Sequence, residues 1–125
     1  ENRAGGSGVT TCITGSPIAL GGGGGAGGAT NNFQSGKGLN FGGARGASNL
    51  TAAQPATANR GGGGGGNNDS ATCSAVPGGS GIVVVRVPGT TNISVSPGTN
   101  SVSACVGPTN DKVATFTVSG TLTIA

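Results

Sequence analysis

The stretch Pro77–Val87, with the sequence PGGSGIVVVRV, decides the fold of this chain. Its residues Ile82 to Val85 form the longest uninterrupted apolar run, and Arg86 and Val87 follow directly. An unbroken run of β-branched residues is typical of a strand that is covered on both faces. We therefore expect Ile82–Val87 to be an interior β-strand.

The segment after this strand predicts a β-hairpin. Short alternating runs at 92–96 (NISVS) and 101–106 (SVSACV) flank the turn signal Pro97-Gly98-Thr99-Asn100. Two such runs around a loop that contains Pro-Gly are typical of paired antiparallel strands.

Period-two alternation is clearest in the last stretch, 114–125 (ATFTVSGTLTIA). This pattern predicts a strand or a tight hairpin, with Ser119-Gly120 as its turn or bulge. We expect the stretch either to close its own sheet beside Ile82–Val87 or to pair with a neighbouring subunit, as a strand at a chain end can. The residues predicted to carry assembly are apolar members of these strands: Ile82, Val84, Phe116, Val118, Leu122 and Ile124.

The N-terminal part is dominated by glycine, which supplies 29 of the 125 residues. Weak strand signals at Val9–Thr14 and Pro17–Leu20 precede two glycine-rich runs, 21–28 and 61–66. Glycine runs can form extended threefold helices of the polyproline-II type, whose backbone groups must pair with neighbouring chains. Irregular ordered loops or a flexible linker are the alternatives.

These patterns predict one all-β module over residues 1–125, with a glycine-rich half (1–76) and a β-strand half (77–125). We expect a small antiparallel β-sandwich or sheet, with glycine-rich extended segments packed beside it and no helix. Because the chain begins at Glu1 and not at Met, we expect a processed product or a piece of a longer protein.

The apolar content is low for a chain that must fold by itself. Leu, Ile, Val and Phe occupy 23 of 125 positions, and the net charge is only +3. Such a chain has too little apolar surface for a self-sufficient core. Assembly supplies stabilising contacts that exist only in the folded, associated state, so we expect a homo-oligomer.

Composition also argues against several classes of function. The six basic residues are scattered singly, which does not favour a nucleic-acid partner. The carboxylates Glu1, Asp69 and Asp111 are far apart and histidine is absent, so we expect no enzyme, no metal and no cofactor. With apolar runs no longer than four residues, we also expect no membrane span.

Three widely spaced cysteines, Cys12, Cys73 and Cys105, leave two interpretations open. An odd number outside the cell suggests one internal disulfide, of unknown pairing, and one thiol that is free or paired between chains. Alternatively, all three are small buried apolar residues.

The order of motifs resembles a known family. The sequence runs from GSPIALGGGGGAGG through GGGGGG and PGGSGIVVVRV to DKVATFTVSGTLTIA. It is similar to a glycine-rich module of bacteriophage tail-fibre and virion proteins, which also occurs in bacterial surface proteins. Here Val87 stands where that family usually has tyrosine, and residues 88–111 have no counterpart. The resemblance implies a fibre or adhesion part and supplies no catalytic residues.

Three functional classes follow. The first is a structural subunit or module of an extracellular or virion fibre, which assembles head to tail. The second is an adhesin or receptor-binding tip that recognises a glycan or protein of a host-cell surface. The third is binding to ice or another crystal surface by the row Thr115, Thr117, Ser119, Thr121 and Thr123. All three place the protein outside the cell.

Overall fold

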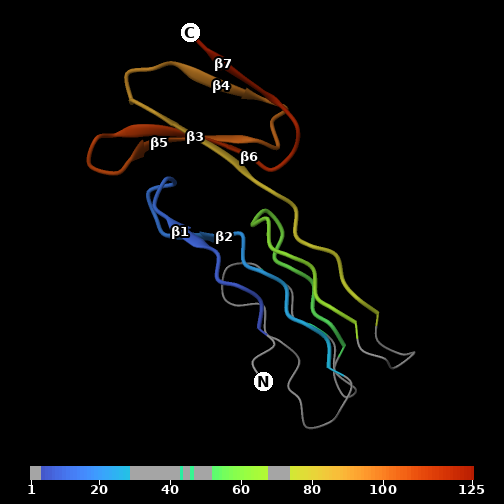
Figure 1. Cartoon of the computed structure of the whole chain (residues 1–125). Coiled ribbons are helices and arrows are strands. Elements are labelled where there is room, and N and C mark those ends of the chain that lie inside the picture. The colour runs from blue at the N-terminus through green and yellow to red at the C-terminus, as the bar shows by residue number, and fades with distance from the viewer. Residues whose placement is uncertain (1–3, 29–42, 44–45, 47–51, 68–73) are drawn as a thin grey trace. The chain divides into compact units, whose positions relative to one another are not determined.

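Figure 1 shows a computed structural model that describes residues 4–28, 43, 46, 52–67 and 74–125. Within these residues there is no helix, so none that is long and apolar enough to cross a membrane. The regular elements are strands in three small sheets, which confirms the all-β prediction. The strands are β1 (Val9–Thr11), β2 (Ile18–Leu20), β3 (Val83–Val87), β4 (Ile93–Ser96), β5 (Ser101–Val106), β6 (Asp111–Phe116) and β7 (Thr121–Ile124).

The chain divides into two compact units. One, here called the glycine unit, comprises Glu1–Thr10 and Ala19–Gly81. The other, the strand unit, comprises Thr11–Ile18 and Ile82–Ala125. The boundary therefore falls directly before the apolar run, and the loop between β1 and β2 belongs to the strand unit.

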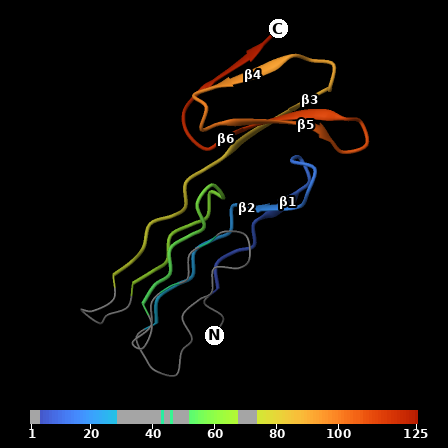
Figure 2. The ribbon, with the colours of Figure 1, turned by 180° about the vertical axis from the view of Figure 1, so that it is seen from behind.

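The strand unit is built from two antiparallel sheets (Figure 2). The larger has the order β3-β6-β5, and the smaller pairs β4 with β7. Strand β4 packs against β5 and β6, so the two sheets share one small core. The apolar pairs Ile93–Ile124 and Val95–Leu122 lie on one face of the smaller sheet, whereas its other face carries hydroxyl side chains.

The prediction that Ile82–Val87 is an interior strand is wrong. Strand β3 is at an edge of its sheet, and Val83 is 59% exposed. The central strand is β6, which pairs with β3 from Val83–Phe116 to Val87–Lys112 and with β5 on its other side. The remaining β3 side chains are half-buried on both faces of the sheet. The run of valines therefore reflects partial burial of both faces and does not indicate a central strand.

The predicted hairpin between β4 and β5 is also wrong. Strand β4 pairs with β7, and β5 pairs with β6. The turn at Pro97–Asn100 therefore carries the chain from one sheet to the other. Residues 114–125 likewise do not form one strand or one hairpin, because β6 and β7 lie in different sheets. The first part of this stretch lies in β6, which pairs with β3 of the same chain. This agrees with the alternative in which the stretch closes its own sheet beside Ile82–Val87.

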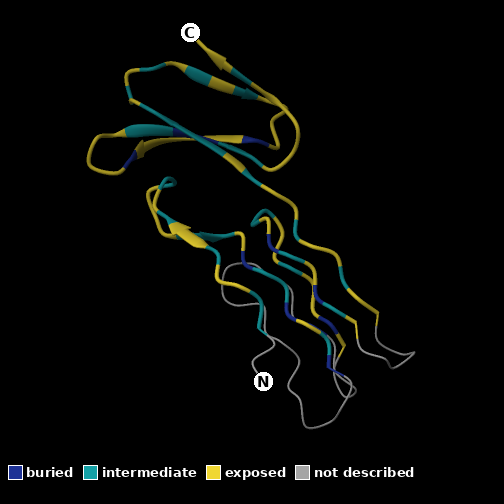
Figure 3. Cartoon of the chain, viewed as in Figure 1, coloured by how far each residue is buried: buried dark blue, intermediate teal, exposed yellow. Residues whose placement is uncertain are grey.

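The core of the strand unit is small. Among the described residues of this unit, the buried apolar side chains are Val106, Val113 and Ala114, which are 9%, 2% and 0% exposed. Figure 3 shows how few positions are buried along the strands. No described large side chain is completely buried. Short side chains on the central strand keep the two sheets close, and the amount of apolar surface that they bury is correspondingly modest.

The glycine unit is ordered by a different rule. Within its two glycine runs the buried positions recur every third residue, at Gly22, Gly25 and Gly28 in one run and at Gly62 and Gly65 in the other. A period of three is the repeat of the polyproline-II helix. The glycine runs are therefore packed extended segments, as predicted, and in the described residues they are not a linker.

Backbone hydrogen bonds repeat with the same period. The Gly63 and Gly66 amides donate to the carbonyl oxygens of Gly22 and Gly25, at 2.8 and 2.9 Å. On the other side of the second run, the amides of Val76 and Gly79 donate to the oxygens of Gly65 and Gly62, at 3.2 and 2.9 Å. These bonds pair neighbouring segments instead of closing turns within one segment.

Glycine is required where these segments touch. A Cβ atom on Gly24 would overlap the carbonyl oxygen of Gly64, and one on Gly43 or Gly46 would overlap the oxygen of Gly23 or Ala26. The Cα–H groups thus lie against carbonyl oxygens, an arrangement that contributes weak hydrogen bonds. Bare backbone therefore forms most of this interior, and Ala53, which is 8% exposed, is the buried apolar side chain among the described residues of this unit.

Candidate functional site

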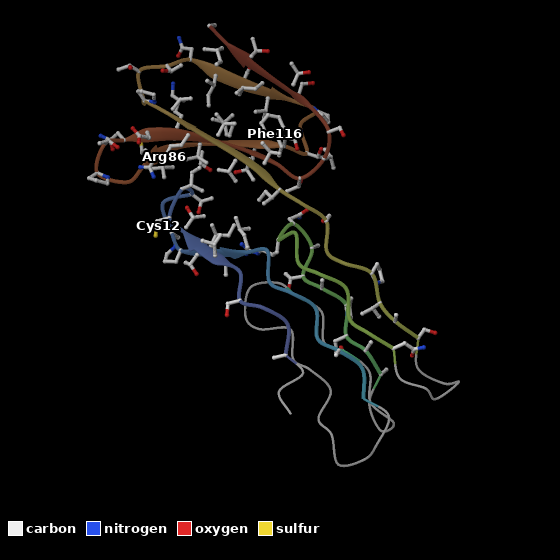
Figure 4. All side chains as sticks on the ribbon, in the orientation of Figure 1. Cys12, Arg86 and Phe116 are labelled. Carbon is white, nitrogen blue, oxygen red and sulfur yellow. The ribbon has the colours of Figure 1, made fainter. Side chains whose placement is uncertain are left out.

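The side chain of Arg86 on β3 makes polar contacts to three other segments of the strand unit (Figure 4). Its Nε donates to Oδ2 of Asp111 at 2.8 Å, and its Nη2 donates to the carbonyl oxygen of Val106 at 3.2 Å. Nη1 is 3.5 Å from the carbonyl oxygens of Cys12 and Ile13. Arg86 therefore fastens the Cys12 loop, β3 and both ends of the β5–β6 turn to one another.

Electrostatics at this cluster favours the ionised carboxylate. Hydrogen bonds from Arg86 and Thr109 lower the pKa of Asp111 below 3.8, and the positive charge of Arg86 acts in the same direction. Partial burial opposes this shift. Since every charged group of the pair is already engaged, the cluster has the character of a structural clasp.

A second clasp is made by Asn100, which is 4% exposed. Its Oδ1 accepts hydrogen bonds from the amides of Thr117 and Val118, at 3.1 and 3.3 Å. These amides belong to the link between β6 and β7. Asn100 therefore holds this link against the turn that follows β4, and its buried Nδ2 has no hydrogen-bond partner.

Neither clasp was found from the sequence. The sequence shows Arg86 as the single charged residue within an apolar run. A charge in such a place needs a partner when it is buried, and this is the only sequence signal for the clasp. Asn100 is the last residue of a turn motif, and nothing in the sequence separates it from the exposed asparagines of other turns.

The residues predicted to carry assembly are distributed over both sheets. Ile82, Val84, Phe116 and Leu122 are half-buried. Val118 is 47% exposed in the link between β6 and β7, and Ile124 is 63% exposed on β7. The structure brings Phe116 opposite Val83, and Ile124 opposite Ile93, so the predicted assembly residues do not share one face.

The predicted row of hydroxyl side chains is divided in the same way. Thr115 lies on β6, opposite Val84 and Ser101, whereas Thr121 and Thr123 lie on β7 in the other sheet. Residues 115–123 therefore do not form one regular flat row, and the prediction of such a row is wrong.

Two of the three cysteines are exposed free thiols. Cys12 lies in the loop between β1 and β2, and Cys105 lies in β5 at a φ of 59°. They are not joined to each other, and they are not small buried apolar residues. Cys73 lies outside the described residues, so its pairing stays a prediction.

Groups for catalysis or metal binding are sparse in the described part of the chain. Asp111 is paired with Arg86, and Glu1 and Asp69 lie outside the described residues. The described residues contain no group of three metal-binding side chains. The features available for function there are the strand edges and the exposed apolar side chains Val83, Val102, Val118 and Ile124.

Comparison with known proteins returns no similarity: no protein-family model, no curated protein and no solved structure matches this chain significantly. The chemistry and geometry of its own residues therefore carry the functional argument.

Proposed function

We propose that this chain is a structural subunit or module of an extracellular or virion fibre, which assembles head to tail through its strands and its glycine-rich segments. It acts as a building part and carries out no reaction. The proposal follows what the resemblance of the sequence motifs to tail-fibre modules implies.

The observation that carries the proposal is the imbalance between buried and exposed apolar side chains in the strand unit. Three apolar side chains are buried in its described residues, and two of them are valines. Four large apolar side chains are exposed on the same unit. A single copy thus leaves apolar surface in water that a neighbouring copy would cover, and covering it stabilises the assembled state.

The glycine unit supports the same proposal. Its segments bind one another through backbone groups at intervals of three residues, without large side chains. Backbone pairing of this kind joins segments without large side chains, so the same chemistry is available for joining segments of neighbouring copies along a fibre.

The test is whether the pure protein polymerises without a ligand. Light scattering over a concentration series, with negative-stain electron microscopy of the same samples, should show filaments. A particle of constant mass at every concentration would contradict the proposal.

A matched pair of variants sharpens the test. Ile124→Asp places a charge on an exposed apolar position of β7, and Thr123→Asp places the same charge on the opposite face of the same strand. Both positions are exposed, so both variants should fold. Ile124→Asp should raise the concentration at which filaments appear more than Thr123→Asp does; equal shifts would show that the apolar face of β7 takes no part.

The second candidate is an adhesin or receptor-binding tip for a host-cell glycan or protein. Glycan sites usually include an exposed aromatic ring. Phe116 is half-buried at the end of β6, and Phe33 and Phe41 lie outside the described residues. Saturable binding of a non-polymerising sample to a glycan array or to host cells would favour this candidate over the fibre.

A further inference from the structure

The outer edge of β3 is an unpaired strand edge in the described part of the chain. Strand β6 pairs with its inner edge over five consecutive positions, without any irregularity. Four of the five β3 residues are valine. A regular, apolar strand edge is a template for another strand, because its backbone amides and carbonyls have no partner.

The opposite edge of the same sheet is protected. Strand β5 has a register shift between Ser103 and Val106, and Cys105 within it has a positive φ of 59°. Such an irregularity bends a strand and interrupts its ladder, which is a common protection against edge-to-edge pairing. Strand β3 has no bulge and no proline or glycine between Val83 and Val87.

The one charge on β3 does not protect its edge either. Nε of Arg86 is 2.8 Å from Oδ2 of Asp111, and the two other guanidinium nitrogens lie at carbonyl oxygens of the same unit. The charge is therefore compensated within the copy that carries it, and a second strand that approaches the edge meets no uncompensated charge.

We propose that β3 pairs in antiparallel orientation with β3 of a second copy of this chain. The two strands are related by a twofold axis that passes between the two copies of Val85. The inference goes beyond the proposed fibre, because twofold pairing gives a closed dimer and not a head-to-tail contact. It joins two three-stranded sheets into one continuous sheet, in which both copies of β3 are interior strands.

The register follows from side-chain chemistry. Paired residues of neighbouring antiparallel strands lie on the same face, so a twofold axis must pass midway between the two copies of one β3 residue, by which it is named here. An axis through Val85 pairs Val85 with Val85 of the partner subunit and covers the 59% exposed Val83 with Val87 of the partner subunit. It places Arg86 opposite Val84 of the partner subunit.

Neighbouring registers are worse. An axis through Arg86 would set two guanidinium groups directly opposite each other, and like charges in that position are destabilising. It would also bring Pro88, which has no amide hydrogen, into the ladder. An axis through Val84 would pair only Val83, Val84 and Val85 among the strand residues. The axis through Val85 is the one that uses all five residues of β3.

The pairing accounts for the difference between sequence and structure at this strand. An unbroken run of β-branched residues is typical of interior strands, yet β3 of a single copy is an edge strand. In the dimer the run occupies the interior position for which its composition is typical.

Sedimentation velocity of the full chain, in reducing buffer and below the onset of polymerisation, tests the dimer. Val83→Lys places a charge at the paired edge, at a position that is exposed in a single copy. Val102→Lys places the same charge on β5, at the protected edge of the same sheet. We expect a dimer for wild type and Val102→Lys, and a dimer Kd that is at least about tenfold weaker for Val83→Lys.

Hydrogen exchange of the unmodified protein gives an independent readout. Those amides of Val83–Val87 that point to the outer edge should become more protected as the protein concentration rises, while the amides of β5 should not change. A monomeric wild type, or Val83→Lys and Val102→Lys dimers of equal strength with no concentration dependence of exchange in β3, would overturn the proposal. The fibre is judged separately, by filaments in scattering and microscopy, so the two proposals fail by different observations.

Discussion

The glycine unit and the strand unit are ordered by opposite means. In the glycine unit, segments approach until a Cβ atom on Gly24 would overlap the backbone of Gly64, and amide-to-carbonyl bonds recur every third residue. In the strand unit, ladders of backbone bonds align strands whose side chains then fill a small core around Val113 and Ala114. One unit excludes side chains, and the other depends on them.

The two units should therefore be sensitive to different kinds of mutation: the glycine unit to added side-chain volume, and the strand unit to changed polarity. Adding a single methyl group should damage the glycine unit wherever two segments touch, because rigid backbone occupies the space there. In the strand unit the damage should come from changing the polarity of the few buried positions, whereas its exposed apolar positions should tolerate charge. The following variants test this contrast.

The largest effect is expected at Val113, which is 2% exposed on the central strand. Val113→Asp buries a carboxylate that has no partner of its own. It should lower the free energy of unfolding by about 3–5 kcal/mol, which is enough to unfold the strand unit. Val83→Asp, at an exposed position of the edge strand, should leave the monomer folded. Circular dichroism and chemical denaturation measure both, and equal losses would contradict the assignment of β6 as the central strand.

The next effect concerns the glycine unit. Gly24→Ala sets a methyl group against the Gly64 carbonyl and should cost about 1–3 kcal/mol. Gly6→Ala is the matched control, because a Cβ atom there has nothing within 4 Å. That control should be neutral or stabilise by up to about 1 kcal/mol, since alanine restricts the unfolded chain. The chain has no Trp or Tyr, so calorimetry is the suitable measurement; a harmless Gly24→Ala would show that the glycine segments do not touch.

Asn100 tests whether a single polar side chain joins the two sheets of the strand unit. Asn100→Ala leaves the amides of Thr117 and Val118 without their acceptor and should cost about 1–3 kcal/mol. Asn92→Ala, at an exposed position before β4, should change the free energy of unfolding by less than about 0.5 kcal/mol. Faster hydrogen exchange at residues 117 and 118 in Asn100→Ala alone would identify the lost bonds, and unchanged exchange would exclude this role.

The smallest effect is the pH dependence of the Arg86–Asp111 clasp. The folded state lowers the pKa of Asp111, so its contribution to stability is fully present above the unfolded value near 3.8 and is lost as the pH falls through the folded value. The difference in stability between wild type and Asp111→Asn should therefore be greatest near neutral pH and should shrink in acid. A difference that stays constant down to low pH would mean that the ion pair does not set the pKa of Asp111.

Much of this architecture follows from local sequence signals. The alternation at 101–106 and 114–125, and the β-branched run at 82–87, place strands where β5, β6, β7 and β3 occur. The turn residues Pro97-Gly98 end β4 as expected. Strand ends differ by a few residues, as at Val9–Thr11, where the predicted strand continued to Thr14. These signals are local because backbone preference and side-chain alternation act over a few residues.

The sequence by itself determined that this is an all-β chain, because alternating β-branched residues are typical of strands. For the glycine runs it left packed segments, irregular loops and a linker open, and the backbone hydrogen bonds of the structure decided in favour of packing. Only the tertiary structure decided which strands are neighbours. It placed Val113 and Ala114 at the centre and the valines of β3 at the edge. It also brought Arg86 to Asp111, which is 25 residues away in the sequence, and Asn100 to the amide of Thr117, which is 17 residues away. The physical reason is that strand order and these clasps depend on contacts between residues that are distant in the sequence. One local pattern of apolar and polar residues is compatible with several different strand pairings, so it cannot select among them.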